Sequence, residues 1–336
     1  MRNSAIQVGF ALLLAAAVAT AEPPSPAAKA YAQGREHLAR RTSDDLRSAV
    51  KDFEKATTAD PTFAPAFAGL AETCALLYDY PHAREAASRA LALDEHLASA
   101  HAVLGFVRLH ADWDWAGAET ELRRALELDP QAATPHLWTA ILLEATGRSD
   151  EAIKEARRAV ELQPKDAQVR AGLGYRLYWA RRYDEAVAEL TAAADLDPAL
   201  ETAHYFIGRA RAQQSRFDDA RAAFAKARKL APKDPNLTSA EAYLEALAGD
   251  KKKAELSVAD LERLALRDLP FNSQVAAIHA ALGDKTAALG WLELAQSEHE
   301  SAMVWIKIDP RFDSLRAEPR FVEILRKMGL EKKAEP

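Results

Sequence analysis

The sequence predicts an all-α solenoid of about eight stacked helix hairpins that ends in a carboxy-terminal cap. Three observations support this prediction. Prolines recur with a period of about 34 residues, two columns of alanine recur in step with them, and larger apolar residues lie three or four positions from the small ones. Apolar residues at that spacing indicate amphipathic helices, and a repeat of this length indicates stacked pairs of helices.

The prolines set the length of the unit. They are Pro61, Pro130, Pro164, Pro198 and Pro232. The last four are evenly spaced by one period, and the first precedes the second by two periods and one inserted residue. Because proline cannot continue a helix, each of them marks the end of the second helix of a unit.

Two alanine columns and a column of alanine or glycine keep the same period. The first is Ala49, Ala83, Ala118, Ala152, Ala186 and Ala220; the second is Ala56, Ala90, Ala125, Ala159, Ala193 and Ala227; the third is Ala71, Gly105, Ala140, Gly174 and Gly208. Side chains this small let two helix axes approach closely. Each unit is therefore expected to be an antiparallel hairpin, and the hairpins must stack because neither helix can bury its apolar face alone.

The amino-terminal residues 1–21 read as a secretory signal. Arg2 is followed by an apolar stretch from Ile6 to Val18 and then by the small-x-small pattern Ala19-Thr20-Ala21. We expect cleavage there, with an uncleaved anchor as the alternative. The apolar stretch is shorter than the roughly 20 residues that span a bilayer, so no stable membrane insertion is expected after cleavage. Residues 22–29, rich in proline and alanine, are expected to form an extended linker.

The rest of the chain divides by how well it keeps the period. Residues 30–234 hold six regular units, and residues 235–300 hold two divergent hairpins, marked by Gly-Asp turns. Residues 301–336 contain the strings DPRF and EPRF and are expected to form a closing cap over the last apolar face, as the terminal unit of a solenoid must.

The charge balance and the cysteine count limit what this chain can be. The 336 residues carry 44 Lys and Arg against 50 Asp and Glu, a net charge of -6, so a nucleic-acid partner is not expected. The single cysteine, Cys74, allows no internal disulfide and falls at a helix core position, where a buried, inert thiol is expected.

No catalytic or metal-binding constellation emerges. The sequence has no His-Glu-x-x-His, no Gly-x-Ser-x-Gly and no glycine-rich phosphate loop, so we predict no catalytic residue, no cofactor and no metal. His101, His136 and His204 recur at one repeat position and are interpreted as packing residues. The string Asp112-Trp113-Asp114-Trp115 coincides with the inserted residue, and we expect a turn whose tryptophans wedge between hairpins.

The small residues fall at positions 8, 20 and 27 of each unit and proline at position 32, and in this the chain resembles the tetratricopeptide repeat from about residue 30 to residue 294. More closely, it resembles the repeat-bearing halves of bacterial winged-helix or kinase regulators, through strings such as DWDWAGAETELRRALELDP and IKIDPRFDSLRAEPRFVEILRKMGL. The resemblance implies a right-handed superhelix with a concave groove lined by positions 5, 9 and 12 of each first helix. For a bacterial protein carrying an export signal, the expected compartment is the periplasm.

This groove stripe is apolar and aromatic in the middle of the array, where an ordinary solvated stripe would be polar. The residues at or beside it are Phe106, Leu109, Leu137, Ile141, Tyr175, Tyr178, Trp179, Tyr205 and Arg209. Rigid rings give contact area at low entropic cost, so the stripe is a candidate site for a peptide or helix of a partner protein.

The sequence therefore predicts a noncatalytic, exported scaffold for protein–protein interaction. Several alternatives remain open. The aromatic track could be filled by tight curvature or by the amino-terminal tether, which would make its rings core. The concave face could instead hold a small molecule, or an enzyme site with His110 as base, or the chain could be a self-assembling structural spacer.

Overall fold

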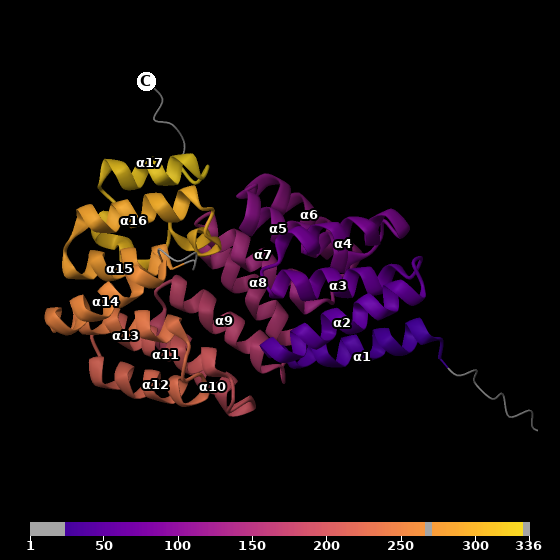
Figure 1. The fold of residues 1–336 in the computed structure, drawn as a ribbon, viewed down its shortest axis with the longest axis horizontal. Helices are drawn as coiled ribbons and strands as arrows, with labels where there is room; N and C mark the ends of the chain where they lie inside the picture. The colour runs from indigo at the N-terminus through magenta and orange to yellow at the C-terminus, as the bar shows by residue number, and fades with distance from the viewer. Residues whose placement is uncertain (1–23, 266–270, 332–336) are drawn as a thin grey trace, which may run out of the picture.

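The structure is a computed structural model that describes residues 24–265 and 271–331. Over these residues it is all helical, without strands. Eight antiparallel hairpins follow one another along a curved array (Figure 1). They are α1 (Pro26–Arg40) with α2 (Ser43–Ala59), α3 (Ala64–Leu76) with α4 (Tyr80–Leu93), α5 (Ala98–Val107) with α6 (Trp115–Leu128), α7 (Ala133–Ala145) with α8 (Ser149–Leu162), α9 (Ala167–Trp179) with α10 (Tyr183–Leu196), α11 (Glu201–Gln213) with α12 (Phe217–Leu230), α13 (Pro235–Leu247) with α14 (Lys251–Ala265), and α15 (Asn272–Leu282) with α16 (Lys285–Ser297). The predicted α-solenoid is confirmed.

The small residues make the close helix contacts that their spacing predicts. At Gly105, Gly174 and Gly208 a β-carbon would lie only 2.4–2.6 Å from a carbon of the large side chain on the second helix of the same hairpin. That side chain is Leu122 opposite Gly105, Leu190 opposite Gly174 and Phe224 opposite Gly208, and each is fully or almost fully buried. The missing methyl group is therefore what allows the two helices to pack at this distance.

The amino terminus of the array departs from expectation. Helix α1 begins at Pro26, inside the stretch 22–29 that was expected to be an extended linker, and the side chain of Ser25 caps it by accepting a hydrogen bond from the Ala28 amide. Proline at the first turn of a helix loses no hydrogen bond, so the Pro- and Ala-rich composition suits a helix start here. The proposed signal, residues 1–21, lies outside the described residues.

The inserted residue in the third unit is absorbed by a helical distortion. A π-helical turn, η1 (Arg108–Asp112), ends α5, and Trp113 follows it in the left-handed region at φ 53°. The tryptophans of this string do not wedge between neighbouring hairpins. The Trp113 ring stacks on His299 at 4.6 Å, and Trp115 Nε1 donates to the Met328 carbonyl at 2.6 Å.

After α16 the chain turns back over the array. Two 3-10 turns, η2 (Ser301–Trp305) and η3 (Pro310–Leu315), precede the last helix, α17 (Pro319–Lys327), which packs on α16. Turn η2 contacts η1 and α7, whereas η3 contacts α15 and α16. The carboxy-terminal residues therefore cap the last hairpins and also reach back to the middle of the array, as Figure 1 shows.

Within the described residues, the length and hydropathy that a bilayer-crossing helix needs do not occur together in any helix.

Candidate functional site on the concave face

The nine predicted groove residues lie on or at the end of the first helices of units three to six, and most are buried. Phe106, Leu109, Tyr178, Trp179 and Arg209 are buried; Leu137, Ile141, Tyr175 and Tyr205 are half-buried. The structure brings Tyr178, Trp179, Tyr205 and Arg209 into one cluster around Phe206. Tyr175 joins this cluster through Phe206, on which it packs at 4.3 Å, and its hydroxyl donates to Thr202 Oγ1.

The cluster is covered by the chain itself. We call residues 299–316 the strap. Its Trp305 ring stacks on Trp179 at 5.8 Å with the planes 8° apart, and it meets the His110 ring edge-on at 5.7 Å. His110 in turn packs on Phe106, with ring centroids 4.3 Å apart. The aromatic track is therefore occupied, and the occupant comes from the carboxy-terminal side of the array rather than from the amino-terminal tether.

A guanidinium group links the track to the strap. The Arg209 carbon Cζ lies 4.7 Å from the Tyr178 ring centroid and 4.9 Å from that of Trp179, within range of favourable cation–π attraction. Asp309 of the strap lies 3.9 Å from Arg209 and forms an ion pair of 2.6 Å with Arg311. Burial alone would raise the pKa of Asp309, but Arg311 and Arg209 outweigh it, so the pKa is lowered and the carboxylate stays ionised.

Two titratable groups are buried beneath the strap. Burial lowers the pKa of His110 to about 3, so the imidazole is neutral near pH 7. Burial raises the pKa of Glu144 to about 8, against the opposing charge of Arg176, whose Nε lies 2.8 Å from Glu144 Oε2. His110 is 1% exposed, which leaves it out of reach of a substrate in this arrangement. It does not have the accessibility that a general base needs.

The strap is also held at its ends. Trp113 stacks on His299 at its start, and Arg181 donates to Asp313 at 2.7 Å near its end. These contacts join residues 132 or more positions apart in sequence, so periodic spacing could not predict them.

In the described ranges, no three His, Cys, Asp or Glu side chains converge as ligands of one metal ion. Cys74 is buried, and burial raises the pKa of its thiol to about 12. A thiol with this pKa is almost fully protonated at neutral pH and is a poor nucleophile.

The histidines interpreted as packing residues have a different role in two of three cases. His101 Nδ1 lies 2.8 Å from Glu121, and His136 Nδ1 lies 2.6 Å from Glu155, each carboxylate coming from the second helix of the same hairpin. His204 has no such partner among the described residues.

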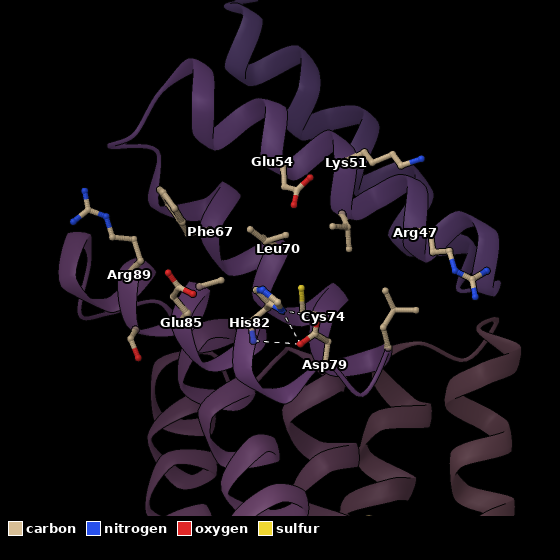
Figure 2. Close-up of a pocket in the computed structure, with 14 residues that line it drawn as sticks. Arg47, Lys51, Glu54, Phe67, Leu70, Cys74, Asp79, His82, Glu85 and Arg89 are labelled. Carbon is tan, nitrogen blue, oxygen red and sulfur yellow. Dashed lines mark hydrogen bonds and ion pairs between the residues drawn. The ribbon is translucent and has the colours of Figure 1, made fainter. Parts of the chain in front are cut away.

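The sequence interpretation also missed an open groove on the outer side of the first two units (Figure 2). It has a volume of about 1020 Å³ and lies between α2 and α4, with α3 as its floor. We call it the outer groove. Its floor residues are Phe67, Leu70, Cys74 and Leu77.

Comparison with known proteins finds a family model that matches part of the array. The tetratricopeptide repeat family model matches residues 114–167 and 172–235. No curated protein matches the sequence.

Among solved structures, the human IFIT1 dimer with PPP-AAAA is similar over 79% of this chain and 72% of that one, with 16% identity and a TM-score of 0.58. A chain of the APC/C hetero-tetramer Cut9–Hcn1 is similar over 65% of this chain, with 19% identity and a TM-score of 0.54; the match spans 43% of that chain. At these identities the likeness concerns the fold. The family model thus covers the array from α6 to α12, and over this part the stacked hairpins with small residues at their contacts are similar to tetratricopeptide repeats.

Proposed function

We propose that this chain is an exported, noncatalytic scaffold that binds a segment of a partner protein in its concave groove. The observation that carries the proposal is the strap: the groove already holds a peptide segment, with a tryptophan stacked on Trp179 and an aspartate beside Arg209. Tetratricopeptide repeats are in general interaction modules, which supports the coarse statement that this is a protein-binding chain.

The contacts of the strap define what the groove can recognise. An aromatic ring on Trp179 buries a large apolar area at little entropic cost, and a carboxylate beside Arg209 is drawn to a guanidinium already fixed by four rings. A partner segment with a ring and an acidic residue about four positions later would meet both features. Such a segment must displace the strap in order to bind.

The strap leaves several buried polar atoms unsatisfied, which favours its displacement on energetic grounds. In the described part of the chain, the two His110 ring nitrogens, Tyr178 Oη and Trp305 Nε1 have no hydrogen-bond partner of good geometry. A backbone group of Ser301 still acts as a hydrogen-bond partner on the pKa of His110, and the Trp305 side chain does so on that of Glu144. Tyr178 Oη has no such neighbour, and a buried group without a partner costs about 1–3 kcal/mol, so a ligand that supplies one gains stability over the strap.

The test uses the full chain with Trp305→Ala, which removes the ring from the track while leaving its lining intact. A labelled peptide copying residues 299–316 should bind this variant and bind wild type at least about tenfold more weakly, because the strap of wild type competes. The matched control is the same peptide with its own tryptophan changed to alanine. Equal binding of both peptides, or no binding to the opened variant, would refute the groove as a peptide site.

Export is the part of the proposal supported by sequence alone. The pattern of residues 1–21 predicts cleavage after Ala21. Expression of the full chain in a bacterial host, followed by fractionation and mass determination of the intact protein, tests it. A cytoplasmic chain that retains these residues would contradict export.

A further inference from the structure

The outer groove over α3 is distinct from the concave face, and its opening follows from one repeat position. In units three, four and five, position 23 is a glutamate that pairs with position 4 of the first helix. The pairs are His101 with Glu121, His136 with Glu155, and Arg170 with Glu189, at 2.6–2.8 Å. In the second unit these positions are Phe67 and Ala86.

Replacing the pair by apolar side chains leaves a gap between neighbouring second helices. We call units three to five, which carry the pair, the closed units. Ion pairs also bridge neighbouring second helices there, as in Arg148 with Glu119 at 2.8 Å and Arg157 with Glu185 at 3.5 Å. The described residues hold no such bridge between α2 and α4. The only other unit with alanine at position 23, the sixth regular one, also has an open groove, of about 590 Å³, lined by His204 and Ala223. Both open grooves therefore lie in units with alanine at position 23, which relates the opening to this position.

The floor of the outer groove has the shape of a helix-binding site. Phe67, Leu70 and Leu77 are half-buried and apolar, and they follow one face of α3 over ten residues. At 1.5 Å per residue this face is about 15 Å long, which matches about three turns of a docked helix. Amphipathic helices bind in such grooves through apolar residues at i, i+4 and i+7.

The walls of the groove select the charge of the occupant. Glu54 reaches into the groove from α2, and Glu85 projects from α4 (Figure 2). Among the described residues, neither carboxylate has an ion-pair or side-chain hydrogen-bond partner.

The cationic side chains that line the outer groove contact other groups or point away from the two carboxylates. Arg47 pairs with Asp44 at 3.0 Å, and His82 is hydrogen-bonded to Asp79 at 2.7 Å. Arg89 lies over the Phe67 ring at 5.8 Å and donates to the Pro61 carbonyl, while Lys51 points away from the groove in Figure 2. The two carboxylates are thus available to a basic ligand.

We infer that the outer groove docks a basic amphipathic helix of a partner protein, with leucine-like residues on Phe67, Leu70 and Leu77 and a lysine or arginine between Glu54 and Glu85. The site is independent of the concave groove, so either can fail without the other.

The probe is a labelled helical peptide of about 16 residues with leucines at i, i+4 and i+7 and lysines flanking them. Fluorescence anisotropy with the full chain measures its affinity. A second peptide with glutamate at each lysine position is the matched control. The lysine peptide should bind about tenfold or more tightly than the glutamate peptide, because the glutamate peptide places like charges against Glu54 and Glu85.

Closing the groove gives the decisive variant. Phe67→His with Ala86→Glu installs the pair that the third and fourth units already carry, so the fold should be kept, as circular dichroism can verify. We expect the affinity for the lysine peptide to fall about tenfold or more. The matched control, Ala223→Glu, adds a partner for His204 in the other open groove and should leave the affinity unchanged.

Charge reversal tests the assignment of the two carboxylates. Glu54→Lys with Glu85→Lys changes two exposed side chains and should make the glutamate peptide the tighter ligand. Unchanged preference in this variant would overturn the basic-helix assignment, as would equal binding to the closed variant or no binding to wild type.

Sedimentation velocity tests whether a second copy of this chain occupies the outer groove. If wild type self-associates and the closed variant does not, the groove holds a second copy of this chain and the assignment to a partner helix is wrong. A monomer for both, with peptide binding as predicted, supports it.

Discussion

Gly208→Ala isolates the energy of the closest helix contact in the array. A β-carbon at Gly208 would lie 2.4 Å, 2.5 Å and 2.9 Å from three ring carbons of Phe224, which is 2% exposed and cannot move into solvent. Ordinary carbon contacts start near 3.5 Å, so the ring or the helix must shift by about 1 Å. Overpacking of this kind costs about 1–3 kcal/mol.

The control is a glycine in the same secondary structure with open space around it. Gly290 lies within α16 and is exposed, and a β-carbon there would meet no atom within 4 Å. Alanine is favoured over glycine in a helix by about 1 kcal/mol at both sites. The difference between Gly208→Ala and Gly290→Ala therefore reports the contact with Phe224 alone.

Urea unfolding followed by far-UV circular dichroism measures both variants. We expect Gly290→Ala to be slightly more stable than wild type and Gly208→Ala to be about 1–3 kcal/mol less stable than Gly290→Ala. Phe224→Leu added to Gly208→Ala should recover part of the loss by making room. Equal stability of the two alanine variants would refute the packing argument for the small-residue columns.

Three further outcomes follow from the strap and the residues beneath it. Tyr178→Ala with Trp179→Ala should cost several kcal/mol in thermal or urea unfolding, at about 3–5 kcal/mol for each large buried ring, so this pair tests the core and not partner capture. Burial lowers the pKa of His110 to about 3, below its usual 6.5, so its contribution to stability is complete above pH 6.5 and is lost as the pH falls towards 3, by up to about 1.4 kcal/mol per pH unit. His110→Phe should make the stability loss over this range shallower by that share, which urea unfolding at several pH values measures. Arg181→Ala breaks a half-exposed ion pair with Asp313 and should change global stability by less than about 1 kcal/mol, while amide hydrogen exchange of the strap becomes faster; unchanged exchange would mean that this pair does not fasten it.

The fold could be predicted from sequence because each hairpin is held by contacts within a single repeat. Gly174 and Leu190 both belong to the fifth unit, and their meeting follows from the repeat itself. The same periodicity predicts which residues share the concave side, since positions 9 and 12 of each first helix fall on one face. Local spacing therefore determines the array and the composition of its inner face.

The strap could not be predicted in this way. Its contacts, such as Trp305 with Trp179, join segments several repeats apart, and residues 299–316 carry no period of their own. The sequence showed an apolar track but not what covers it. Tyr178 and Trp179 are buried, in agreement with the alternative in which the track is filled and its rings are core.

The outer groove did leave a signal in the sequence. Position 23 is acidic in four of the six regular units, with Asp52 of the first bonded to His37 at 2.8 Å, and it is alanine in the other two. Reading that column beside the small-residue columns would have marked Ala86 and Ala223 as departures. Only the three-dimensional structure shows that the departure at Ala86 opens a groove with an apolar floor.

The strap also changes the mechanics of the whole array. In an open solenoid each unit contacts only its neighbours, so the array can extend and bend elastically and its two ends can unfold separately. Here Trp113 stacks on His299, and Trp115 donates to Met328, 213 positions further along the chain, so the third unit is fastened to the far end of the array. Pulling on the two ends should therefore give one high-force rupture involving the third to eighth hairpins, in place of a series of small steps.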